Sequence, residues 1–122
     1  MTEYVKMQFP ADTEYISAIR LAVSGVAGKK DYNVDEIEDL KSCVSEACLL
    51  VLCGQECSGL SVDIAIEDSL KLKVEGLDAK PLACEECEDF NEEISKLMIE
   101  ALSENVEFKE VDGILYTVSF EK

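Results

Sequence analysis

Six cysteines are the residues of this 122-residue chain whose types and spacing are best suited to chemistry. Four of them form two close pairs, Cys53-x3-Cys57 and Cys84-x2-Cys87. Four thiolates are enough to hold a structural zinc ion in tetrahedral geometry. However, the acids around Cys84 and Cys87 disfavour the thiolate form, and the first spacing is wider than that of a usual zinc knuckle. We therefore expect reduced, partly buried thiols without metal, and a zinc site at these four cysteines stays open as an alternative.

The compartment expected for these thiols is the reducing cytosol. The segment MTEYVKMQFP has acids and a proline where an export signal needs a basic start and an apolar stretch. Cytosolic thiols are kept reduced, so metal binding or core packing comes before disulfides. No run approaches about 18 consecutive apolar residues, which argues against a helix that spans a membrane.

The charge of the chain limits its partners. Eleven basic residues against twenty-seven acidic ones give a formal net charge of −16. Direct binding of nucleic acid is excluded, because neutralising phosphates needs a basic surface. An acidic domain can instead cover the basic surface of a DNA-reading protein, although acids that only maintain solubility are the plainer explanation.

The first half of the chain is predicted to fold as a strand and two helices. The strand covers residues 3–10 and ends at Pro10. A helix capped by Asp12 or Thr13 continues to about residue 28, and a second helix, capped by Asp35, ends near Gly54. Apolar side chains recur at helical spacing in both. Those of the first helix are Ile16, Ile19, Val23 and Val26; those of the second are Ile37, Leu40, Val44, Ala47, Cys48 and Val51, with Cys43 on the same inner side.

The second half changes to a period of two. Alternation predicts strands over residues 62–67 and 70–74, with a turn at Asp68-Ser69. An acidic loop over 77–88 precedes a third helix over about 89–104, expected to bury Phe90, Ile94, Leu97, Met98 and Ala101. Asp112-Gly113 joins strands 105–111 and 114–121 in a hairpin. The order β-α-α-β-β-α-β-β predicts a single α+β domain over 1–122, with helices on one face of a mixed, mostly antiparallel sheet.

Residues 9–48 carry a set of motifs: a proline after the first strand, Ile-Arg-Leu-x-x-Ser-Gly-Val-Ala, and Asp-Glu-Ile-Glu-Asp-Leu-Lys leading into Val-Ser-Glu-Ala-Cys. In this third of the chain the sequence resembles the bacterial anti-sigma serine kinases of the GHKL ATPase superfamily. The rest matches that family by element order only. The resemblance implies the two-layer α/β sandwich shared with histidine kinases and gyrase, and ATP with magnesium as cofactors of an active member.

The nucleotide motifs implied by the resemblance are incomplete. Glu46 matches the family's proposed general base, but Leu50 stands where an asparagine holds magnesium, and leucine offers no oxygen to a hard cation. Gly76 is the only candidate for the first glycine box, and no glycine occurs between 77 and 112. The last helix instead opens with acids, which repel a triphosphate. We expect a degenerate site without bound cofactor, and Glu46 as a vestigial, solvated carboxylate.

Arg20 is the only arginine of the chain. It falls where the family has an arginine that contacts the sigma factor and its antagonist. Residues three and four positions away include no carboxylate to pair with it. Thr13, Ser17, Arg20 and Ser24 are expected to form a polar stripe opposite the buried face, which suits a docking surface. The alternative is an ordinary exposed arginine whose stem packs on its neighbours.

Three hypotheses remain. The first is a non-catalytic, anti-sigma-like regulator, possible as a homodimer, that binds a sigma factor or a STAS-type anti-anti-sigma protein. The second is an active ATP-dependent serine kinase with divergent motifs. The third, a metal or redox sensor, depends on the two cysteine pairs. Leu50 and the missing glycines favour the first.

Overall fold

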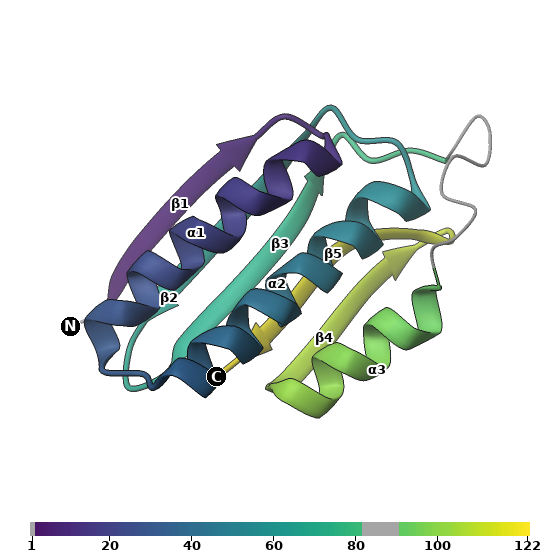
Figure 1. Ribbon diagram of the computed structural model, residues 1–122. Helices are drawn as coiled ribbons and strands as arrows, with labels where there is room; N and C mark the ends of the chain where they lie inside the picture. Colours follow the sequence, from purple (N-terminus) through teal and green to yellow (C-terminus); the bar gives the residue numbers. More distant parts are fainter. Residues whose placement is uncertain (1, 82–90) are drawn as a thin grey trace.

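A computed structural model describes residues 2–81 and 91–122 of the chain. Three helices and five strands follow one another in the predicted order, with short 3-10 turns at Thr13–Tyr15 and Gly28–Lys30 (Figure 1). The elements are β1 (Glu3–Phe9), α1 (Ile16–Ala27), α2 (Val34–Gly54), β2 (Gly59–Ile66), β3 (Leu70–Leu77), α3 (Glu92–Leu102), β4 (Glu104–Val111) and β5 (Ile114–Glu121). No helix of the described part is long and apolar enough to cross a membrane.

The five strands form one sheet in the order β1-β2-β3-β5-β4, and the three helices cover one of its faces. All four strand pairings are antiparallel. The α+β class and the single helical layer are therefore confirmed, with a sheet that is wholly antiparallel in the described residues. In Figure 1, α2 lies at the centre of the helical layer, between α1 and α3.

The core lies between the sheet and this helical layer. Alternate residues of β2 and β3 turn inward, and α1 and α2 meet them with one apolar stripe each. The stripes predicted for α1 and α2 are confirmed, including the burial of Cys43 and Cys48. Fully buried members include Ile19, Val23, Leu40, Val44, Ala47, Val51, Leu60, Val62, Ile64, Leu70, Val74 and Ile99.

The turn between β4 and β5 has the backbone that its sequence predicts. Asp112 and Gly113 adopt φ values of 53° and 80°. Two successive positive φ values are those of a type I′ turn, whose twist matches the flanking strands. Asp-Gly tolerates this conformation, so the hairpin prediction is confirmed.

The start of α2 corrects one prediction. Asn33, not Asp35, caps the helix. The Asn33 carboxamide accepts from the Glu36 backbone N–H at 2.8 Å, and the Glu36 carboxylate accepts from the Asn33 backbone N–H at 3.0 Å. This capping box satisfies two N–H groups at once, which a cap at Asp35 would leave free. Asp12 caps the 3-10 turn before α1, where its carboxylate accepts from Glu14 N–H.

The buried face predicted for the third helix is wrong. α3 begins at Glu92 and buries Ser95 and Ile99, whereas Ile94 and Leu97 are 55% and 65% exposed. Met98 and Ala101 are exposed too, and Phe90 lies outside the described residues. The reason is polar: the Ser95 hydroxyl donates to Glu46 on α2, and Lys96 pairs with Glu110 on β4. These bonds fix the rotation of the helix about its axis.

The segment after β3 is only partly described. Leu77, expected in a loop, belongs to β3, and Glu56 and Lys80 form an isolated bridge with each other. The remainder of the predicted acidic loop, from residue 82, lies outside the described residues.

Candidate functional site

Glu46, the candidate catalytic carboxylate, forms part of a helix–helix contact. It is half-buried on α2, and its carboxylate accepts from the Ser95 hydroxyl of α3 at 2.5 Å. Ser95 is itself only 3% exposed. The carboxylate therefore joins α2 to α3. The sequence predicts a solvated carboxylate and does not predict this contact.

Leu50 lies one helical turn beyond Glu46 and points into the core. It is 2% exposed and belongs to the main hydrophobic cluster. A buried leucine side chain offers a cation no oxygen ligand.

Two side chains of the protein closely approach Gly76. A Cβ added at Gly76 would lie 2.6 Å from the Cys57 sulfur and 2.8 Å from a methyl group of Val51. Both distances are far below van der Waals contact, so only glycine fits on β3 opposite the end of α2. The close approach that the family gives to a nucleotide is here occupied by Cys57 and Val51.

Gln55 closes the same end of α2, and no pattern in the sequence predicted this role. It is 2% exposed, its amide nitrogen donates to the Val51 carbonyl, and its amide oxygen accepts from the Leu115 backbone N–H at 3.3 Å. A buried amide with both ends bonded ties the end of α2 to β5. Among the described residues, Leu50 offers magnesium no oxygen ligand, and Cys57 and Val51 fill the space in front of Gly76.

Burial raises the pKa of three of the described thiols. It raises the pKa of Cys43 to about 11 and that of Cys48 to about 12, and it also raises the pKa of Cys57. The Cys57 thiol donates to the Val51 carbonyl at 3.7 Å, and Cys53 is buried. The described residues bring together no group of three or more histidine, cysteine, aspartate or glutamate side chains that could hold a metal. Cys84 and Cys87 lie outside them, so the expectation of metal-free thiols stays a prediction, and the four-cysteine site stays its alternative.

The predicted polar stripe follows α1 in part. Thr13 lies on the 3-10 turn before the helix, Ser17 is exposed, and Arg20 and Ser24 are half-buried. Arg20 makes no hydrogen bond or ion pair with any described residue. Its guanidinium is therefore available to a partner.

Two apolar side chains beside this stripe were missed. Leu21 is 71% exposed and Tyr15 is 41% exposed. Their signal in the sequence was that neither falls in the helical register of Ile16, Ile19, Val23 and Val26. Arginine is common among interface hot spots, and Arg20 has no partner among the described residues.

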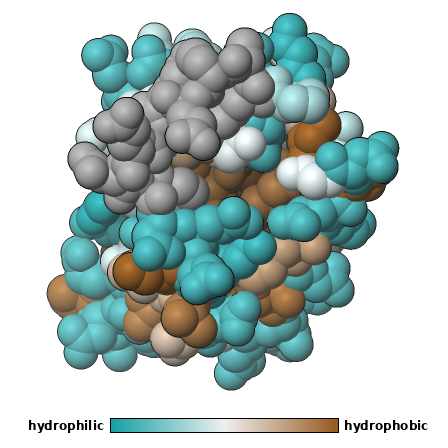
Figure 2. Space-filling model, turned by 90° about the vertical axis from the view of Figure 1, so that its right-hand side faces the viewer, coloured by the Kyte–Doolittle hydropathy of each residue, from teal (hydrophilic) through white to brown (hydrophobic). Residues whose placement is uncertain are grey.

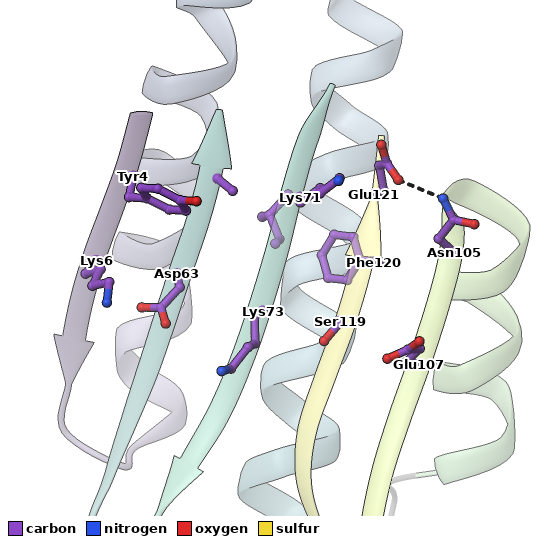
Figure 3. Close-up of a pocket in the computed structure, with 12 residues that line it drawn as sticks. Tyr4, Lys6, Asp63, Lys71, Lys73, Asn105, Glu107, Ser119, Phe120 and Glu121 are labelled. Carbon is purple, nitrogen blue, oxygen red and sulfur yellow. Dashed lines mark hydrogen bonds between the residues drawn. The ribbon is translucent and has the colours of Figure 1, made fainter. Parts of the chain in front are cut away.

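The open face of the sheet carries a hollow of about 650 Å³. Figure 3 shows its lysines beside acids on neighbouring strands: Lys6 pairs in register with Asp63, which pairs in register with Lys73. At its other side Asn105 donates to Glu121 at 2.7 Å. Because the two signs alternate across the strands, the hollow concentrates no positive charge and does not suit a polyphosphate.

Comparison with known proteins gives a partial match. No family model matches the chain. Over 46 residues the chain is 56% identical to the serine-protein kinase RsbW of Bacillus subtilis (strain 168), a match that covers 38% of this chain and 29% of the relative. It is 44% identical over 50 residues to RsbW of Halalkalibacterium halodurans, covering 41% of the chain and 31% of that relative. The resemblance to serine kinases of this family is confirmed over a segment that spans less than a third of the relatives' length.

Proposed function

We propose that the chain is a non-catalytic, anti-sigma-factor-like regulator that acts by binding a sigma factor or a STAS-type anti-anti-sigma protein. The observation that carries this proposal is the packing at the end of α2. There Leu50 is buried, and Cys57 and Val51 occupy the space in front of Gly76.

This packing argues for binding over catalysis. Phosphoryl transfer from ATP depends on positioning the phosphates and on a magnesium ion that neutralises developing charge. Leu50 supplies no magnesium ligand, and Glu46 is hydrogen-bonded to Ser95. The similarity to proteins named serine-protein kinases, together with the retained Glu46, is what supports the competing kinase hypothesis.

The proposed docking surface is the exposed side of α1 around Arg20, which we call the α1 surface and define by Ser17, Arg20, Leu21 and Ser24. The guanidinium has no partner among the described residues, and it can form a bidentate contact with a carboxylate. The net charge of −16 adds a long-range attraction to the basic surface of a DNA-reading partner.

We predict that Arg20→Glu abolishes partner binding and leaves the fold intact. The substitution removes the guanidinium contact and adds repulsion, which weakens binding by about a hundredfold when the site is desolvated. At a half-buried position without internal partners, the free energy of unfolding should change by less than about 1 kcal/mol. The measurement is pairwise binding to purified sigma factors and STAS-domain proteins of the same organism, with melting curves of both proteins.

Lys29→Glu is the matched control, because it reverses a charge at an exposed position just after α1. It should retain binding to within a few-fold. If Arg20→Glu binds every partner as tightly as the wild type, the docking surface lies elsewhere. If it unfolds, the placement of Arg20 on α1 is wrong.

A further inference from the structure

The exposed side of α3 carries the most regular apolar pattern of that helix. Ile94, Leu97, Met98 and Ala101 recur at i, i+3, i+4 and i+7, which places them on one continuous stripe. Ile94, Leu97 and Met98 are 55%, 65% and 37% exposed. The helix contacts the rest of the molecule through a different face. Its own apolar stripe is left open to solvent.

Figure 2 views the molecule from the side of α3 and β4. Hydrophobic groups gather at the lower left of this surface, where α3 lies, and hydrophilic groups surround them. Apolar patches rimmed by polar groups mark interaction sites on proteins more often than scattered single residues do.

Unpaired carboxylates flank the stripe. Helical geometry places Glu93 and Glu100 on the same side of α3, next to Leu97. Neither makes an ion pair or hydrogen bond with any described residue. Lys96 does not offset them, because its ammonium lies 3.0 Å from Glu92 and 3.5 Å from Glu110.

The surroundings strengthen the negative field. Residues 92–111 contain six glutamates against two lysines. A basic ligand is therefore attracted to this side of the molecule before contact, and an acidic one is repelled.

We propose that α3 docks an amphipathic, basic helix of a partner protein. The docking site, which we call the α3 surface, consists of Glu93, Ile94, Leu97, Met98, Glu100 and Ala101. The apolar stripe of the partner packs on that of α3, as in other helix-in-groove complexes. Glu93 and Glu100 are seven residues apart, about 10.5 Å along the axis, so they pair with Lys or Arg side chains at the same spacing.

Charge decides against a second copy of this chain. A two-fold pairing of two α3 surfaces would bring the carboxylates of Glu93 and Glu100 against those of the other copy. The α3 surface shares no residue with the α1 surface, so the two proposals are independent of each other.

The test uses a synthetic 18-residue amphipathic helix with a leucine stripe flanked by lysines. Its controls are a peptide of the same composition in scrambled order and one with glutamate in place of lysine. We expect the full chain to bind the basic helix at least about tenfold more tightly than either control, and less tightly at high salt.

The double variant Ile94→Ser/Leu97→Ser should weaken this binding by at least about tenfold, since it removes two apolar contacts. Val34→Ser is the matched control, an apolar residue at the start of α2 that is 75% exposed and belongs to neither docking surface, and it should leave binding unchanged. Glu93→Gln/Glu100→Gln should reduce both the affinity and its salt dependence, whereas Glu14→Gln/Asp35→Asn, the same change of charge elsewhere, should not.

Equal binding of the basic and scrambled peptides, or an equal loss of binding in Val34→Ser, would overturn the proposal. Sedimentation velocity of the chain alone tests whether a second copy of the chain binds to the α3 surface. Concentration-dependent dimers that Ile94→Ser/Leu97→Ser abolishes would assign the α3 surface to a second copy and would overturn it as well. Melting curves of each variant check that the fold is retained.

Discussion

At the scale of single residues, the positions that resemble the family's nucleotide motifs make structural contacts. Glu46 accepts from Ser95, Leu50 fills the core, and Gly76 makes room for Cys57. Each of these residues contributes to the packing of α2 against its neighbours. Changing Leu50 to the asparagine found in the family should therefore cost stability and should not create a magnesium site.

Leu50→Asn tests this directly, because it reinstates the asparagine that holds magnesium in the family. It leaves an unpaired amide in an apolar environment and removes apolar contacts, which should lower the free energy of unfolding by about 3 kcal/mol. Urea denaturation measures the change. Leu49→Asn, at a half-exposed neighbour, should cost less than about 1 kcal/mol.

The same urea denaturation is repeated with added magnesium. Added magnesium should leave the stability of Leu50→Asn unchanged. A recovery of stability in magnesium, absent from Leu49→Asn, would mean that an intact cation site needs only the asparagine.

At the scale of elements, α2 is the structural centre of the domain. It lies between α1 and α3, packs on β3 and β5, and carries Cys43 and Cys48 on its buried side. Burial raises the pKa of both thiols because the charged thiolate loses its hydration. The native state therefore keeps these protons to higher pH than the unfolded chain does.

This difference predicts a stability that falls in alkali. Below an ordinary thiol pKa of about 9, the Cys48 thiol is protonated in both the native and the unfolded state, so its ionisation does not lower the free energy of unfolding. Above pH 9 the unfolded chain ionises, while native Cys48 keeps its proton up to about pH 12, and the free energy of unfolding falls. Between pH 9 and pH 11, the wild type should lose on the order of 2 kcal/mol more stability than Cys48→Ala. Urea denaturation over this range gives the comparison. Parallel pH profiles of the two proteins would contradict the burial of this thiol.

α3 shows where sequence patterns were insufficient. Its apolar spacing predicts the helix correctly, but the prediction that this apolar stripe faces the core is wrong. Apolar spacing identifies a face without saying what covers it, and the Ser95–Glu46 and Lys96–Glu110 contacts that orient the helix join residues far apart in the sequence. Local patterns carry no information on such pairs.

At the scale of the whole molecule, the element order and the helical layer over one sheet face could be predicted from the sequence. Periodicity and the Asp112-Gly113 turn were sufficient, because they express local backbone preferences. The candidate site was predicted less completely. The absence of Asn at Leu50 was visible in the sequence, whereas the packing of Cys57 against Gly76 and the buried amide of Gln55 depend on contacts between α2, β3 and β5.

The central claim is that this domain binds a partner without using ATP, and a melting experiment with magnesium-ATP tests it most directly. A ligand present at about 100 times its dissociation constant stabilises a fold by about 2.7 kcal/mol, which gives a clear shift in Tm. With an established GHKL ATPase as positive control, we predict an unchanged Tm for this protein in millimolar ATP and magnesium. A magnesium-dependent rise in Tm, lost when Glu46 is changed to Gln, would contradict the claim and support the kinase hypothesis.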